Sequence, residues 1–243
     1  MTAAGSTITL LVGAVLLRLT FTGTYRRYVR VGMGPWLGVA GVTVVVLGLV
    51  TLAWALHRAR GRADLPAEGG HEHPHGVDDG HGHREGVAVG WLLLAPIAAL
   101  LLVAPPTLGS YGVNRAAAVN VRSGGAVFDP LPKDGRAVEM TLLEYGQRAF
   151  DRHGSSLAGS TAVLTGFVAS TESGGFRLAR YQIACCAADA VPAVVIVEGV
   201  TSHQPRRDSW VRVSGTYADG PGDLPRITAV SVVEIAVPNE PYE

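Results

Sequence analysis

Apolar residues are distributed unevenly along the chain, with long uninterrupted runs confined to the first half. The runs cover residues 7–23, 35–56 and 87–104. Each is close to the roughly 20 residues that an α-helix needs to cross a bilayer. Arg18 is the one charged residue inside a run, and it lies near enough to the end for its guanidinium to reach the interface. The pattern predicts three transmembrane helices; two crossings remain an alternative.

The second half shows a different pattern, with short runs of β-branched and aromatic residues separated by turn-forming Gly, Ser, Pro and Asp. Five such runs predict strands, at residues 161–169, 176–184, 191–198, 210–217 and 226–237. Five short strands at this spacing suit a small closed barrel of the OB type. A helix is expected before them, over residues 137–150. The predicted fold class is therefore a membrane α-helical N-terminal half, with three transmembrane helices, followed by an all-β, OB-like five-stranded barrel.

These patterns also set the expected domain boundaries. Residues 1–104 form the transmembrane region, which includes a histidine-rich loop at 57–86. Residues 105–136 form a linker, and residues 137–243 form the soluble OB-like domain. Within the second predicted strand, the apolar positions change parity between Phe176 and Tyr181. Because alternate residues of a strand face opposite sides, this change predicts a bulge or bend there.

Composition supports a membrane protein and narrows the functional classes. The 243 residues are 48% hydrophobic and 16% charged, which is more apolar than a typical soluble domain. The formal net charge is zero, and Phe167, Phe176 and Trp210 have core-like neighbours instead of lining a basic groove. These features argue against nucleic-acid binding. The sequence contains no recognisable Ser-His-Asp triad, phosphate loop or Rossmann glycine pattern, so we do not expect an enzyme.

The distribution of arginines does not decide the orientation in the cell membrane. Arginines flank the apolar runs on both sides at similar numbers. The cluster that follows the most apolar run favours a cytoplasmic histidine loop and an extracytoplasmic C-terminal domain. The opposite orientation stays open. The arginines concerned are Arg26, Arg27, Arg30, Arg58, Arg60, Arg62, Arg84, Arg115 and Arg122.

Five histidines alternate with glycines and carboxylates in the loop between the second and third runs. Imidazole is a good ligand for zinc, nickel and copper, and a flexible loop could wrap one ion with several sets of ligands. We therefore expect a collector or sensor of divalent metal. The alternative is a solvated linker whose histidines titrate near neutral pH. The histidines are His71, His73, His75, His81 and His83.

Both cysteines of the chain are adjacent, at the end of the second predicted strand. Cys185 and Cys186 would point to opposite faces of a regular strand, so their thiols converge only if the strand ends there. In a turn, the two thiols and Asp189 could hold zinc or another divalent metal. A strained vicinal disulfide is the redox alternative. A third alternative is that both are small buried apolar side chains.

Several short motifs resemble the YcgQ-type family of permease-associated membrane subunits. They are TGTYRRYV after the first run, the histidine loop, LTGFV from Leu164, RYQIACCAADA from Arg180, WVRVSG from Trp210 and PNEPY from Pro238. The resemblance implies that the partner is a separate multi-pass permease, with transport of a metal such as zinc. It implies no catalytic residues.

The motifs and the residues lead to one main functional expectation. Three crossings are too few for a typical self-contained transporter, so transport would require another chain. The expected function is that of an accessory permease subunit that handles a divalent metal ion at the bilayer. The alternatives are a membrane-tethered assembly module with a protein-binding barrel, and a membrane thiol redox protein.

Overall fold

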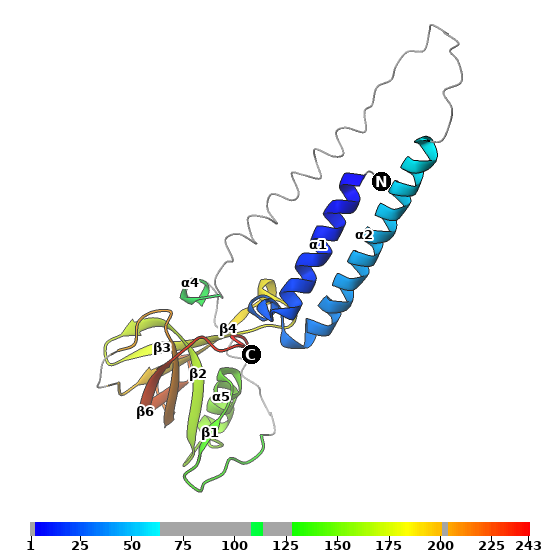
Figure 1. The fold of residues 1–243 in the computed structure, drawn as a ribbon. Coiled ribbons are helices and arrows are strands. Elements are labelled where there is room, and N and C mark those ends of the chain that lie inside the picture. Colours follow the sequence, from blue (N-terminus) through cyan, green and yellow to red (C-terminus); the bar gives the residue numbers. More distant parts are fainter. Residues whose placement is uncertain (1–2, 64–107, 114–127, 201–203) are drawn as a thin grey trace, which may run out of the picture. The chain divides into compact units, whose positions relative to one another are not determined.

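The computed structural model describes residues 3–63, 108–113, 128–200 and 204–243 (Figure 1). The chain divides into two compact units, which are described separately. The first comprises residues 1–25 and 32–105, and the second comprises residues 26–31 and 106–243. The short segment 26–31 therefore belongs to the second unit, although in sequence it lies between the two long helices of the first.

The first unit contains two packed helices, α1 (Ala3–Phe21) and α2 (Gly34–Ala63) (Figure 1). Small residues are buried where the helices meet, among them Gly13, Gly41 and Gly48. A Cβ atom on Gly13 would lie 2.6 Å from Val45 Cγ2 and 2.9 Å from Val45 N, so the two backbones approach closely there. Close approach at small residues is typical of helix pairs in membranes.

Large apolar side chains of α2 point away from the helix pair, among them Trp36, Val46, Leu47 and Trp54. In Val31–Arg58, the most apolar 18-residue window has a mean hydropathy of 2.4 and is 11% buried. Among the described residues, this is the one helix that is long and apolar enough to cross a membrane. The apolar stretch of α1, Gly5–Phe21, is shorter, and the predicted run 87–104 lies outside the described residues.

The second unit is built on a mixed six-stranded sheet. Its order is β1-β2-β3-β4-β6-β5, and β2 also pairs with β5, so each strand from β3 to β6 has two neighbours and β2 has three. The β1–β2 and β4–β6 pairs are parallel and the others are antiparallel. The strands are β1 (Ala137–Glu139), β2 (Thr161–Glu172), β3 (Gly175–Gln182), β4 (Val191–Glu198), β5 (Trp210–Ala218) and β6 (Arg226–Ile235).

The five predicted strands are all present, and β4 has the predicted bounds. The predicted helix over 137–150 is wrong in its first part, because residues Ala137–Glu139 form β1 and the helix α5 spans Leu142–Phe150. The helix begins after Thr141, whose hydroxyl accepts the Glu144 N–H at 3.0 Å. This N-cap satisfies one of the free amides of the first turn and sets the boundary that the apolar pattern missed.

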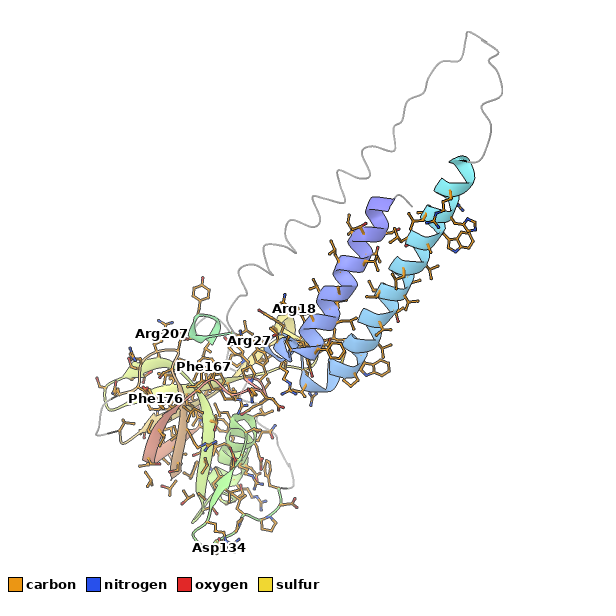
Figure 2. The ribbon with its side chains drawn as sticks, viewed as in Figure 1. Arg18, Arg27, Asp134, Phe167, Phe176 and Arg207 are labelled. Atoms are coloured by element: carbon orange, nitrogen blue, oxygen red, sulfur yellow. The ribbon has the colours of Figure 1, made fainter. Side chains whose placement is uncertain are left out.

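The side chains of the sheet enter two separate apolar clusters. Phe176 and Leu178 belong to the larger cluster, under α5, whereas Ala179 and Tyr181 belong to a second cluster with Phe167. Figure 2 labels Phe167 and Phe176 within this domain. The parity change in β3 thus reflects its contribution to both clusters. The predicted bulge in β3 is wrong, because its register with β4 is unbroken; the irregularity lies in β2, between Val168 and Ser170.

Candidate functional site: the cysteine turn

The segment between β3 and β4 forms a tight turn that we call the cysteine turn, residues 183–190. Because β3 ends at Gln182, the cysteines lie outside the regular strand. The Asp189 carboxylate organises the turn by accepting backbone N–H groups from Ala184 at 3.0 Å, Cys185 at 2.8 Å and Cys186 at 3.4 Å. One carboxylate thus satisfies three successive amides that have no strand partner.

The turn brings the two thiols to one side. Cys185 Sγ and Cys186 Sγ are 3.6 Å apart, and ligand atoms of Cys185, Cys186 and Asp189 all lie within 4.8 Å of one another. Cys185 is exposed and Cys186 is half-buried, so two fully buried apolar side chains are excluded as an interpretation. Among the described residues, this is the group of His, Cys, Asp or Glu side chains close enough to hold one ion. The five histidines of the predicted metal loop lie outside those residues.

Hydrogen bonding inside the turn favours the protonated form of the Cys185 thiol. The Cys185 thiol donates to Asp189 and contacts Cys186, and these interactions raise the pKa of Cys185 to about 11. The same thiol, followed by the backbone amides, lowers the pKa of Asp189. Cysteines that exchange disulfides commonly have a lowered pKa. The environment of Cys185 has the opposite effect, which argues against a reactive redox thiol. Because a metal ion binds the thiolate, an ion at this turn would have to displace the Cys185 proton.

A second segment, far away in sequence, pairs with the backbone of the cysteine turn. Residues 26–31, here called the connector, form an antiparallel bridge between Val29 and Cys186. The Arg30 N–H donates to Cys185 O at 3.1 Å, and the Ala187 N–H donates to Tyr28 O at 2.7 Å. These two backbone bonds flank Cys186. No sequence pattern predicts this pairing, because Val29 and Cys186 are about 157 residues apart and a single bridge leaves no periodic pattern.

The C-terminal residues 240–243 are fixed beside the turn by β3. Arg180 donates to Glu240 O at 2.7 Å and lies 3.6 Å from the Glu243 carboxylate, whose side chain is 3% exposed. Glu243 also accepts the Leu142 N–H, at the start of α5, and the Gln182 side-chain amide at 2.6 Å. Burial raises the pKa of Glu243, and the Leu142 amide and Arg180 oppose that rise. Residues 180–182 and residues 240–243 are thus joined by hydrogen bonds and an ion pair.

The Tyr242 hydroxyl links this tail to two further segments. It donates to Arg27 O of the connector at 2.7 Å and accepts the Leu108 N–H at 3.4 Å. Tyr181 donates to the neighbouring Gly109 O at 3.0 Å. The connector and residues 108–109 are therefore held on the same unit by side chains from β3 and the tail.

A separate cleft of about 490 Å³ lies between the end of α5 and the β5–β6 loop. Arg152 and His153 line it and have left-handed backbone conformations, at φ 45° and 53°. Its two guanidinium groups already face carboxylates, since Arg152 pairs with Asp151 and Arg226 with Glu198. Asp219 also lines the cleft and accepts the Gly220 N–H at 3.0 Å. Among the described residues, the group of side chains placed to hold one ion is at the cysteine turn and not in this cleft, so the turn is the better candidate site.

The described residues define a protein with a helix suited to crossing a membrane and a mixed-sheet domain that carries a dithiol–carboxylate turn. Residues 6–117 match the DUF1980 N-terminal domain, and residues 147–243 match the DUF1980 C-terminal domain. The chain therefore carries both domains of the DUF1980 family. No curated protein and no solved structure matches it.

Proposed function

We propose that this protein is a membrane-anchored accessory subunit of a separate permease, of the YcgQ type, and that its cysteine turn captures a divalent cation such as zinc. The observation that carries the proposal is the separation of 3.6 Å between the two thiol sulfurs, with a carboxylate beside them. Two sulfurs bound at 2.3 Å to a tetrahedral ion would be about 3.8 Å apart, whereas a linear two-coordinate ion would need about 4.6 Å. The turn therefore favours a tetrahedral ion.

The number of ligands favours transient capture over a structural role. Structural zinc sites usually have four protein ligands, whereas Cys185, Cys186 and Asp189 supply three and Cys185 is exposed. A fourth position would stay open to water or to a ligand from a partner. An ion bound in this way can be passed on, which is what an accessory subunit of a permease requires.

The pairing of β2 with β5 supports the OB-like barrel predicted from sequence. The five strands β2 to β6 are joined in a ring, with β4 and β6 parallel, although that pair involves three residues of each strand. Phe167, Phe176 and Trp210 are buried, so they do not supply the exposed stacking surface of a nucleic-acid groove. We infer that the barrel serves as a platform for the turn and for a protein partner.

Hydrogen bonding within the second unit supports an even number of crossings between the connector and residue 108. Tyr242 contacts both Arg27 and Leu108, so both segments lie on one side of any membrane. The helix α2 accounts for one crossing between them. A second is required, and the apolar run 87–104 is the candidate. The histidine loop would then lie on the side opposite the cysteine turn.

Labelling from each side of the membrane tests this topology. We expect a membrane-impermeant maleimide to reach the native cysteines and a Gly32→Cys thiol from the same side. A Gly76→Cys thiol in the histidine loop should react from the other side. The two introduced cysteines are placed in a Cys185→Ser/Cys186→Ser background, and labelling after permeabilisation serves as the reference. Reaction of all three sites from one side would rule out the second crossing.

Metal titration tests the proposed function. Intact protein in nanodiscs is compared with a variant in which the five loop histidines are replaced by alanine, and with Cys185→Ser/Cys186→Ser. With cobalt(II) as the probe, we expect a sulfur-to-cobalt charge-transfer band in the first two proteins and its loss in the third. Equally weak binding by all three would overturn metal capture, and the assembly-module alternative would then take its place.

A further inference from the structure

The connector contacts the backbone of the cysteine turn on both sides of Cys186. Arg30 N–H donates to Cys185 O, and Tyr28 O accepts the Ala187 N–H. The Tyr242 hydroxyl holds the preceding carbonyl, Arg27 O, at 2.7 Å. The connector thus supplies backbone hydrogen bonds to the residues that carry the thiols, although none of its own side chains belongs to the ligand group.

These bonds fix the dipeptide that must be ordered for an ion to bind. Cys186 has an extended backbone, with φ −154° and ψ 171°, and the Asp189 carboxylate holds the opposite edge of the turn. Fixing a residue's backbone in one conformation costs conformational entropy. When the connector is paired with Cys186, the turn is ordered before the ion binds. When the connector is unpaired, part of the binding free energy of the ion is used to order the turn, and the ion binds more weakly.

We propose that the connector is an integral part of the cysteine site, so that connector pairing and ion capture are thermodynamically coupled. The inference rests on the proposed function, because it requires an ion at the turn. Coupling between two binding events is reciprocal: if the paired connector strengthens ion binding, ion binding strengthens connector pairing by the same factor. The connector ends at Val31, and α2 begins at Gly34, so the segment that senses the ion leads directly into the membrane-suited helix.

Substitutions at Arg30 separate the backbone contribution from that of the side chain. Arg30→Pro removes the N–H that donates to Cys185 O, and proline is compatible with an extended segment. Arg30→Ala removes the same guanidinium but keeps the N–H, so it is the matched control. We expect Arg30→Pro to weaken cobalt(II) binding about fivefold or more relative to Arg30→Ala, measured from the charge-transfer band in the full chain. Arg30→Ala should remain within about twofold of the native protein.

Hydrogen exchange provides a second measurement that does not depend on any variant folding. Saturating zinc should slow exchange of the Arg30 and Ala187 amides in the native chain, by a factor comparable to the affinity lost in Arg30→Pro. Equal affinities for Arg30→Pro and Arg30→Ala, or exchange unaffected by zinc, would overturn the coupling while leaving metal capture intact. A native chain without a charge-transfer band would overturn both.

Discussion

Replacing Arg180 by alanine is expected to destabilise the sheet domain by about 3 kcal/mol at neutral pH. The Arg180 side chain is 17% exposed and faces a Glu243 carboxylate that is 3% exposed. Removing one partner of such a pair leaves the other charge buried without compensation, which costs more than the pair itself contributes. Arg180 also donates to Glu240 O and lies 5.9 Å from the centre of the Trp210 ring, so the tail and the second apolar cluster lose contacts as well.

The pH dependence of the stability lost in Arg180→Ala tests whether the loss comes from the buried Glu243 charge. Without Arg180, burial raises the pKa of Glu243 further above that of an unfolded glutamate. The folded state then binds the proton more tightly than the unfolded state, so stability rises as the pH falls through that pKa. We expect the deficit of Arg180→Ala to shrink in acid, as measured by denaturant unfolding of the full chain followed by near-ultraviolet circular dichroism.

A double-mutant cycle supplies the control. Glu243→Gln keeps an acceptor for the Leu142 N–H but removes the charge, so Arg180→Ala/Glu243→Gln should recover part of the lost stability. Additive effects of the two substitutions, or a loss below 1 kcal/mol in Arg180→Ala, would show that this ion pair does not hold the tail.

Replacing Asp189 by asparagine is expected to make Cys185 react about tenfold faster with iodoacetamide near neutral pH. The hydrogen bond to the Asp189 carboxylate is the largest cause of the raised Cys185 pKa of about 11. Returning this pKa toward about 8.5 to 9 increases the thiolate fraction roughly 100-fold. Nucleophilicity falls by about half a logarithmic unit for each unit of pKa, so the net gain is about tenfold.

The same substitution tests whether Asp189 both orders the turn and binds the ion. Oδ1 of Asp189 accepts the Ala184 N–H, and Oδ2 accepts the Cys185 and Cys186 N–H groups. The single carboxamide oxygen of asparagine can keep the bonds to Cys185 and Cys186 but not the one to Ala184, whereas alanine keeps none. We therefore expect Asp189→Asn to lose cobalt affinity with most of the turn retained, and Asp189→Ala to lose both, with faster exchange of the Cys186 amide. The alkylation rate is read by mass spectrometry of the tryptic peptide. An unchanged rate in Asp189→Asn would disprove control of the thiol by the carboxylate.

Sequence patterns predicted those parts of the fold that depend on local order. The strands, the apolar helices and the position of the cysteines after β3 follow from periodicity and from turn residues close in sequence. The start of α5 was misplaced because the capping hydroxyl of Thr141 interrupts an apparently continuous helical stretch. The histidine loop lies outside the described residues and remains a prediction.

The contacts around the cysteine turn could not be predicted in the same way. The bond from Tyr242 to Arg27 joins residues 215 positions apart, and it involves a backbone carbonyl that any residue could supply. Arg180 could be recognised as part of a motif, but its partners Glu240 and Glu243 carry no pattern that points to β3. Isolated long-range polar contacts of this kind leave no periodic signal in one sequence.

The bridge between Val29 and Cys186 can form only after both segments have been translated. The connector leaves the ribosome early, but the strand edge and the tyrosine that receive it are among the later residues to be translated. The membrane-suited helix α2 can thus be inserted well before the domain closes around the connector. A chain interrupted before Tyr242 would lack the hydroxyl that holds Arg27 O, so the connector would be held to the domain by fewer bonds.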